Sequence, residues 1–128
     1  FRLKSLKKII KKRRKNVEIY LNYLNKKFIF IPKENKKEFN TYHTFVVQVN
    51  KRDALQKFLN KKGIGTAVHY PTPIHLQPAF KKLKYKVNNL PETIRQSKKI
   101  ITLPIHQYLK TTEILKICHE INSFYENK

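Results

Sequence analysis

The sequence lacks methionine and tryptophan altogether, and its 128 residues include only two glycines and one cysteine. Two glycines, Gly63 and Gly65, are too few for a glycine-rich loop that cradles a phosphate group. The single thiol, Cys118, excludes an internal disulfide and fits a reducing compartment. Because the chain begins at Phe1 and contains no methionine, we expect it to be a piece of a longer polypeptide.

Acidic residues are scarce: 8 Asp and Glu accompany 29 Lys and Arg, for a formal net charge of +21. Such a charge is compatible with nucleic acid or an anionic surface as a partner. Only five of the basic residues are Arg, the side chain that reads bases through paired contacts. Lys, Asn and Ile are enriched together, which fits a coding bias better than a specific ligand. We do not expect a specific nucleic-acid role, and a basic nucleic-acid or polyanion-binding module is the alternative function.

Long apolar runs are absent as well. No segment approaches the roughly 20 apolar residues that span a bilayer, and residues 1–10 lack the apolar stretch and small-residue cleavage site of a secretory signal. We therefore expect a cytoplasmic protein without a membrane partner. Its 40% of hydrophobic residues is enough for one compact domain with a core.

Hydrophobic periodicity and turn residues predict alternating helices and strands. Helices are expected at 3–24, from 51 to about 62, at 78–83, at 91–99, and from Thr111 to near the C-terminus. Strands are expected at 42–49, 64–68 and 100–103. The apolar run 28–31 is either a strand or a packed linker, and 33–40 is a surface loop. Asn50 and Thr111 are expected to cap their helices, and Gly63 to end one in the left-handed conformation.

These elements predict a small α+β domain, with a mostly antiparallel sheet of about three strands and helices on one face, preceded by a long helix. The other face of the sheet would then point toward a missing part of the protein. Basic residues line one face of the first helix, and we interpret them as a solvated surface rather than a polyanion-binding face.

The connection 69–80, with the sequence HYPTPIHLQPAF, is the candidate site. Three prolines stiffen a segment that carries two histidines, a tyrosine and a glutamine, and a stiff loop holds polar groups in place at little entropic cost. His69 and His75 have no carboxylate or cysteine cluster beside them, so a metal site is not expected. Cys118 lies on the apolar face of the last helix and is expected to be packed and unreactive. None of these groups forms a self-sufficient catalytic site.

The run GIGTAVHYPTPIHLQPAF (63–80) resembles a signature of the small C-terminal domain of DegT/StrS aminotransferases. Three further segments resemble this domain in the same order: the helix LKSLKKIIKKRRKNVEIYLNYL (3–24), the strand YHTFVVQV (42–49) and the closing segment SKKIITLPIHQYLKTTEILKI (97–117). The resemblance covers nearly the whole chain.

The resemblance implies an interdomain helix over 1–26 and a small C-terminal domain over 27–128 of a fold-type I pyridoxal-phosphate (PLP) enzyme. Such an enzyme transfers an amino group, usually from glutamate, to a keto sugar attached to a nucleotide, in cell-surface polysaccharide or amino-sugar biosynthesis, and is a homodimer. The family's PLP lysine belongs to the large domain. No lysine here has the corresponding S-F-H-x-x-K-like context, so the chain alone is expected to be inactive. A non-catalytic remnant is a further alternative.

The resemblance also implies where the sugar would lie. Residues of the proline-rich loop and one residue of the first strand are expected to contact the substrate or to order the wall of its pocket: His69, Tyr70, Pro71, Thr72, Pro73, His75, Gln77 and His43. His69 and Tyr70 are the first choices. No catalytic or metal-binding residue is expected in the chain, and PLP would be bound mainly by the large domain.

Overall fold

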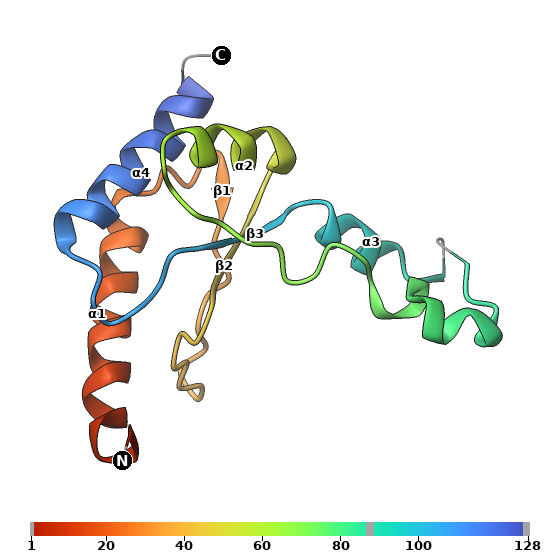
Figure 1. Cartoon of the computed structure of the whole chain (residues 1–128), viewed down its shortest axis with the longest axis horizontal. Helices are drawn as coiled ribbons and strands as arrows, with labels where there is room; N and C mark the ends of the chain where they lie inside the picture. The colour runs from red at the N-terminus through yellow and green to blue at the C-terminus, as the bar shows by residue number, and fades with distance from the viewer. Residues whose placement is uncertain (1, 87–88, 127–128) are drawn as a thin grey trace.

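The computed structural model describes residues 2–86 and 89–126 of the chain. Its elements follow one another in the order η1 (Arg2–Ser5), α1 (Leu6–Tyr23), β1 (Ile29–Phe30), β2 (Phe45–Val49), α2 (Arg52–Lys61), η2 (Ile74–Leu76), η3 (Pro78–Leu83), α3 (Pro91–Ser97), β3 (Ile100–Leu103) and α4 (Thr111–Glu126), where η denotes a 3-10 helix (Figure 1). Within the described residues, no helix is both long and apolar enough to cross a membrane.

The three strands form one antiparallel sheet in the order β1-β2-β3. Ile29 of β1 lies opposite Val49 of β2, and Phe45 of β2 lies opposite Leu103 of β3. The expected antiparallel three-stranded sheet is therefore confirmed. β2 begins three residues later than expected because Tyr42 adopts a positive φ of 49°, which an extended strand does not contain.

The expected strand over 64–68 is wrong. This segment contributes one isolated bridge, between Ala67 and Thr102 of β3, and the third strand is β1, in the apolar run whose structure the sequence left open. Pro71 and Pro73 follow closely after the bridge. Since a proline has no N–H to donate to a ladder, the chain leaves the sheet edge at this point.

Helices α1 and α4 lie side by side on one face of the sheet, with α2 beside them at one end of the strands (Figure 1). The ring of Tyr20 in α1 stacks on the ring of Phe45 in β2, with 5.0 Å between their centroids. Side chains from all these layers are almost fully buried: Tyr20, Leu55, Leu59, Ile101, Ile114 and Ile121. On the other face Phe30 remains 60% exposed, so the helices cover one face only, as predicted.

Two predicted helix caps are wrong. The N-cap of α2 is Lys51, which has a left-handed backbone with φ 52° and makes no side-chain cap bond, rather than Asn50. Thr111 is the first residue of α4. The N–H of Lys110 donates to the carboxylate of Glu113 at 2.7 Å, as in the part of a capping box where the third helical residue reaches back.

Other helix boundaries differ by small shifts. Gly63 follows α2 with φ +74°, which confirms the predicted left-handed end. α3 ends at Ser97 instead of 99, because the carbonyl of Lys99 already accepts a hydrogen bond from the N–H of Val49 across the sheet, at 3.0 Å. The first helix starts as the 3-10 turn η1, and 78–83 is also a 3-10 helix.

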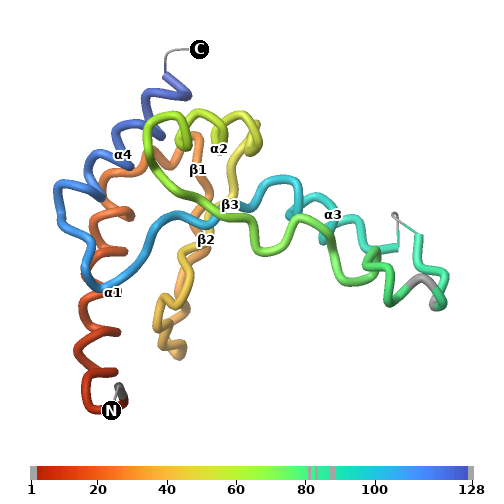
Figure 2. Tube along the Cα trace, viewed as in Figure 1, coloured from red at the N-terminus to blue at the C-terminus, as the bar shows by residue number. Residues whose placement is uncertain are grey.

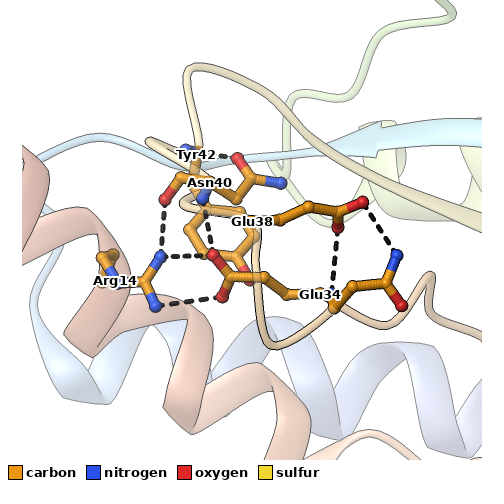
Figure 3. A network of polar contacts seen from close by, with 6 residues as sticks. Arg14, Glu34, Glu38, Asn40 and Tyr42 are labelled. Atoms are coloured by element: carbon orange, nitrogen blue, oxygen red, sulfur yellow. Dashed lines mark hydrogen bonds and ion pairs between the residues drawn. The ribbon is translucent and has the colours of Figure 1, made fainter.

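An ion pair fixes the loop before β2 to the first helix (Figure 3). The guanidinium of Arg14 donates to both carboxylate oxygens of Glu34, at 2.8 and 2.9 Å, and to the carbonyl of Asn40 at 2.7 Å. The carboxylate of Glu38 accepts from the backbone N–H and the side-chain amide of Asn35. The loop expected over 33–40 is therefore on the surface but held by directed hydrogen bonds.

Residues 70–86 and 89–98 form an arm that leaves the sheet beside β3 and extends away from α1 and α4 (Figures 1 and 2). It contains η2, η3 and α3. Large apolar side chains on the arm are exposed: Tyr70, Ile74, Tyr85 and Leu90. Both ends of the arm meet at the sheet, where Ala67 pairs with Thr102.

Candidate functional site

The candidate site lies where the arm begins, in the site loop, residues 69–77. Both backbone groups of Ala67 bond to Thr102, the N–H at 3.2 Å and the carbonyl at 2.7 Å. Two residues later, Nδ1 of His69 lies 2.9 Å from Oγ1 of the same threonine. The sheet therefore fixes the backbone two residues before His69, and Thr102 holds its imidazole.

Tyr70 follows His69 and is 73% exposed. The two rings meet edge to face with 5.5 Å between centroids, and the peptide bond between them is cis. Tyr70 opens onto a hollow of about 270 Å³ between the site loop and α3. The hollow is lined by Tyr70, Thr72, Pro73, Ile74, Glu92, Thr93, Gln96, Ser97 and Ile100.

The wall formed by α3 was not predicted. Glu92, Thr93 and Gln96 come from this helix. Hydrogen bonds from the Arg95 guanidinium and the Gln96 amide hold the pKa of Glu92 at about 2, so this carboxylate is charged at neutral pH. The sequence predicted α3 as a helix, but nothing in it indicated that the arm folds back and brings α3 against the site loop.

The remaining loop residues stiffen the turn. The side-chain amide of Gln77 donates to the carbonyl of Thr72 at 3.0 Å, so one of its two amide hydrogens is already paired within the loop. Pro73 precedes η2 with an extended ψ of 147°, and Pro71 is exposed at the surface. The structure brings Tyr70, Thr72 and Pro73 to the hollow, and Gln77 supports them from behind.

His75 points into the arm instead of the hollow. It is 7% exposed and its ring meets the ring of Tyr85 edge to face, with 6.3 Å between centroids. Its Nε2 is buried and has no hydrogen-bond partner among the described residues. His75 therefore packs inside the arm, against the segment that follows η3.

His43 does not join this group. It lies in the bend before β2 and is exposed. His43 does not occur among the described residues that line the hollow.

Other reactive groups lie apart from the hollow. Among the described residues there is no group of three or more His, Cys, Asp and Glu that could hold a metal ion. Cys118 is buried in α4, and burial raises the pKa of its thiol to about 12, as expected for a packed cysteine.

The lining of the hollow combines an exposed aromatic ring, hydroxyl groups, an amide and a carboxylate. Each of these polar groups can exchange hydrogen bonds with the hydroxyl groups of a neutral, hydroxyl-rich ligand. Among the described residues, no lysine lines the hollow and none is buried. The described lining therefore offers no amine for a Schiff base, and its polar groups can hydrogen-bond to a polyhydroxylated ligand.

Comparison with known proteins assigns the sequence to a family. The sequence profile of the DegT/DnrJ/EryC1/StrS aminotransferase family matches residues 1–122. A pleiotropic regulatory protein of Geobacillus stearothermophilus is 36% identical over 90% of this chain and 32% of its own length. A dTDP-3-amino-3,6-dideoxy-alpha-D-galactopyranose transaminase of Aneurinibacillus thermoaerophilus is 28% identical over 88% of this chain and 31% of its own length.

The fold agrees with the sequence comparison. The crystal structure of DesV from S. venezuelae, in complex with a ketimine intermediate, superimposes with a TM-score of 0.91 and 27% identity. The match covers 98% of this chain and 34% of DesV. The chain thus spans about a third of the length of the relatives that it matches.

Proposed function

The chain belongs to the DegT/DnrJ/EryC1/StrS aminotransferase family, and we propose that it forms the sugar-facing wall of a PLP-dependent aminotransferase that acts on a nucleotide-linked keto sugar. The family is PLP-dependent, and several relatives are named as transaminases of nucleotide-linked sugars. The role of this chain within such an enzyme rests on its own site loop.

The observation that carries the proposal is the hollow between the site loop and α3. Tyr70, Thr93 and Gln96 offer a ring, a hydroxyl and an amide on the same hollow. His69 is not among the described lining residues, but its ring contacts the ring of Tyr70 and is held by Thr102. A sugar ring presents apolar C–H faces and hydroxyl edges, which such groups can bind together. In our proposal these residues bind and orient the sugar, and Pro71 and Pro73 keep the loop in shape.

The cofactor lies outside this proposal for the chain. Since no lysine of the described part of the chain lines the hollow, we propose that PLP is held by the two thirds of the enzyme that this chain does not span, and that the chain alone is inactive. Glutamate as amino donor, a homodimeric enzyme, a cytoplasmic location and a role in cell-surface polysaccharide or amino-sugar synthesis belong to the same proposal.

A chimera tests the proposal: residues 1–122 replace the matching third of the Aneurinibacillus transaminase. Stopped-flow absorbance then measures the amino-donor and sugar half-reactions separately. His69→Ala removes one hydrogen-bonding side chain, and should slow the sugar half-reaction by about tenfold, the equivalent of about 1.4 kcal/mol, without changing the donor half-reaction. The matched control is His43→Ala, which should change neither. Equal slowing of both half-reactions by His69→Ala would contradict the proposal.

One observation favours a second candidate, a polyanion-binding surface. A hollow of about 560 Å³ beside α1 is lined by Lys8, Lys11, Lys12 and Lys15 and by Tyr108, which is 79% exposed. Lysines bind phosphates, and an exposed ring can stack on a base.

Two matched sets of charge variants test the second candidate through the binding of single-stranded DNA. Replacing Lys8, Lys12 and Lys15 by Gln removes three charges from this surface. Replacing Lys33, Lys36 and Lys37 by Gln removes the same charge elsewhere. If only the first set weakens binding of single-stranded DNA at physiological salt, the second candidate gains support. If both sets weaken DNA binding equally, the binding comes from the overall positive charge and not from this surface.

A further inference from the structure

Thr102 is fixed in the sheet on both sides. It pairs with Val46 of β2 on one side, and its N–H and carbonyl both bond to Ala67 on the other. The residue is only 8% exposed. The hydroxyl of Thr102 therefore has a position set by the backbone of three segments.

His69 lies on the same face as Thr102. Residues directly opposite each other in an antiparallel pair share a face, and so do residues two apart along a strand. Ala67 is opposite Thr102, and His69 comes two residues after Ala67, so the imidazole reaches Thr102 diagonally. The resulting distance between Nδ1 and Oγ1 is 2.9 Å.

Hydrogen-bond pairing differs between the two neutral forms of the His69 ring. Within residues 2–86 and 89–126, Oγ1 of Thr102 has no hydrogen-bond partner besides Nδ1 of His69, in a part-buried contact. If Nδ1 carried the proton, the hydroxyl would accept it, and the hydrogen of the hydroxyl would have no acceptor among the described residues. A donor that is shielded from water and has no partner is costly. If the hydroxyl donates to Nδ1 and the proton of the neutral ring resides on Nε2, no such hydrogen is left unpaired.

We propose that Thr102 is a positioning residue that holds His69 as the Nε2–H form and directs this N–H away from the sheet. His69 is exposed, and its Nε2 is unpaired in the described part of the chain. His69 then offers a hydrogen-bond donor on a ring that meets the ring of Tyr70 edge to face. The complementary ligand atom is an oxygen acceptor, and its assignment to the sugar rests on the function proposed above.

The test is a long-range ¹H–¹⁵N spectrum of the labelled chain at about pH 8, where an ordinary histidine is neutral. A His69→Gln variant assigns the signals of this ring among the five histidines. We expect a protonated Nε2 and an unprotonated Nδ1 in the unmodified chain and in Thr102→Ser, which keeps the hydroxyl. Thr102→Val has the same shape but no hydroxyl, and should show both forms of the ring exchanging.

Two results would overturn the proposal: a proton on Nδ1 in the unmodified chain, or an unchanged His69 spectrum in a folded Thr102→Val variant. Should Thr102→Val not fold, the spectra of the unmodified chain and of Thr102→Ser still decide. No sugar is present in this experiment, so its failure would leave the function of the site loop standing. In the chimera, Thr102→Val should slow the sugar half-reaction and Thr102→Ser should restore it. A purely structural role would not separate these variants in this way.

Discussion

The hydroxyl of Tyr20 donates a 2.9 Å hydrogen bond to the carbonyl of Pro104, which lies 84 positions later in the chain. It connects the long first helix α1 to the segment that follows β3. Tyr20 is fully buried, and burial raises the pKa of its phenol well above its usual range. The first helix therefore packs into the core together with the segment that follows β3.

Tyr20→Phe should destabilise the fold by about 1–2 kcal/mol, because it leaves the partly buried carbonyl of Pro104 without its donor. Urea unfolding followed by circular dichroism measures the change. Tyr23→Phe is the matched control on the same helix, since Tyr23 is exposed, and it should change stability by no more than about 0.5 kcal/mol. Equal effects of the two variants would show that this hydrogen bond contributes nothing specific.

Gly63 and Gly65 offer a second matched pair. Neither has an atom within 4 Å of the place where a Cβ would lie, but only Gly63 has a positive φ, +74°. Gly63→Ala should therefore cost about 1 kcal/mol through backbone strain. Gly65→Ala should be neutral or stabilise by up to about 1 kcal/mol, since it restricts the unfolded chain. Thermal unfolding of both variants checks the difference, and the reverse order would refute it.

The ion pair between Arg14 and Glu34 should make stability depend on pH. Hydrogen bonds from the Arg14 guanidinium and from the N–H of Asn40 lower the pKa of Glu34 below its usual value. A carboxylate with a lowered folded-state pKa stabilises the fold above its unfolded-state pKa, and this contribution is lost as the pH falls through the folded-state pKa.

The stability difference between the unmodified chain and Glu34→Gln should therefore be full at neutral pH and shrink below about pH 4. Urea unfolding across this pH range measures it. In an Arg14→Gln background, Glu34→Gln should have little further effect. A difference that is independent of pH would contradict this account of the loop.

Cys118 should react with thiol reagents only after unfolding. Burial raises its pKa to about 12, so at pH 8 its thiolate fraction is more than about 1,000-fold below that of an ordinary cysteine. A colorimetric thiol assay with and without urea measures the rate. Ser5→Cys in a Cys118→Ser background places a thiol at an exposed position and should react at once. Fast labelling of native Cys118 would show that α4 opens readily.

Local patterns predicted most elements, and failed where distant contacts decide the structure. Hydrophobic periodicity predicted the first helix, and Gly63 marked the end of α2. The run 64–68 has the composition of a strand, but Pro71 and Pro73 take the chain away from the sheet after a single bridge. The four-residue run around Ile29 was too short to distinguish a strand from a linker, and only its pairing with Val49 decides that.

The candidate site was predictable only where its residues are neighbours in sequence. The site loop stood out through its prolines, histidines and tyrosine, which lie next to each other in sequence. The opposite wall comes from α3, about 20 residues further along, and consists of Glu92, Thr93 and Gln96. It faces the site loop only because the arm returns to the sheet, where both of its ends meet. Thr102 is likewise brought to His69 by strand pairing alone.

The most direct test of the account is an NMR titration of the ¹⁵N-labelled chain with a nucleotide-linked hexose at millimolar concentration, beside titrations with the nucleotide alone and with tripolyphosphate. The account predicts amide shifts that centre on the site loop and α3, need the hexose, and disappear in Tyr70→Ala. Shifts that centre on the lysines of α1 and are reproduced by tripolyphosphate, or no shifts at all, would contradict it.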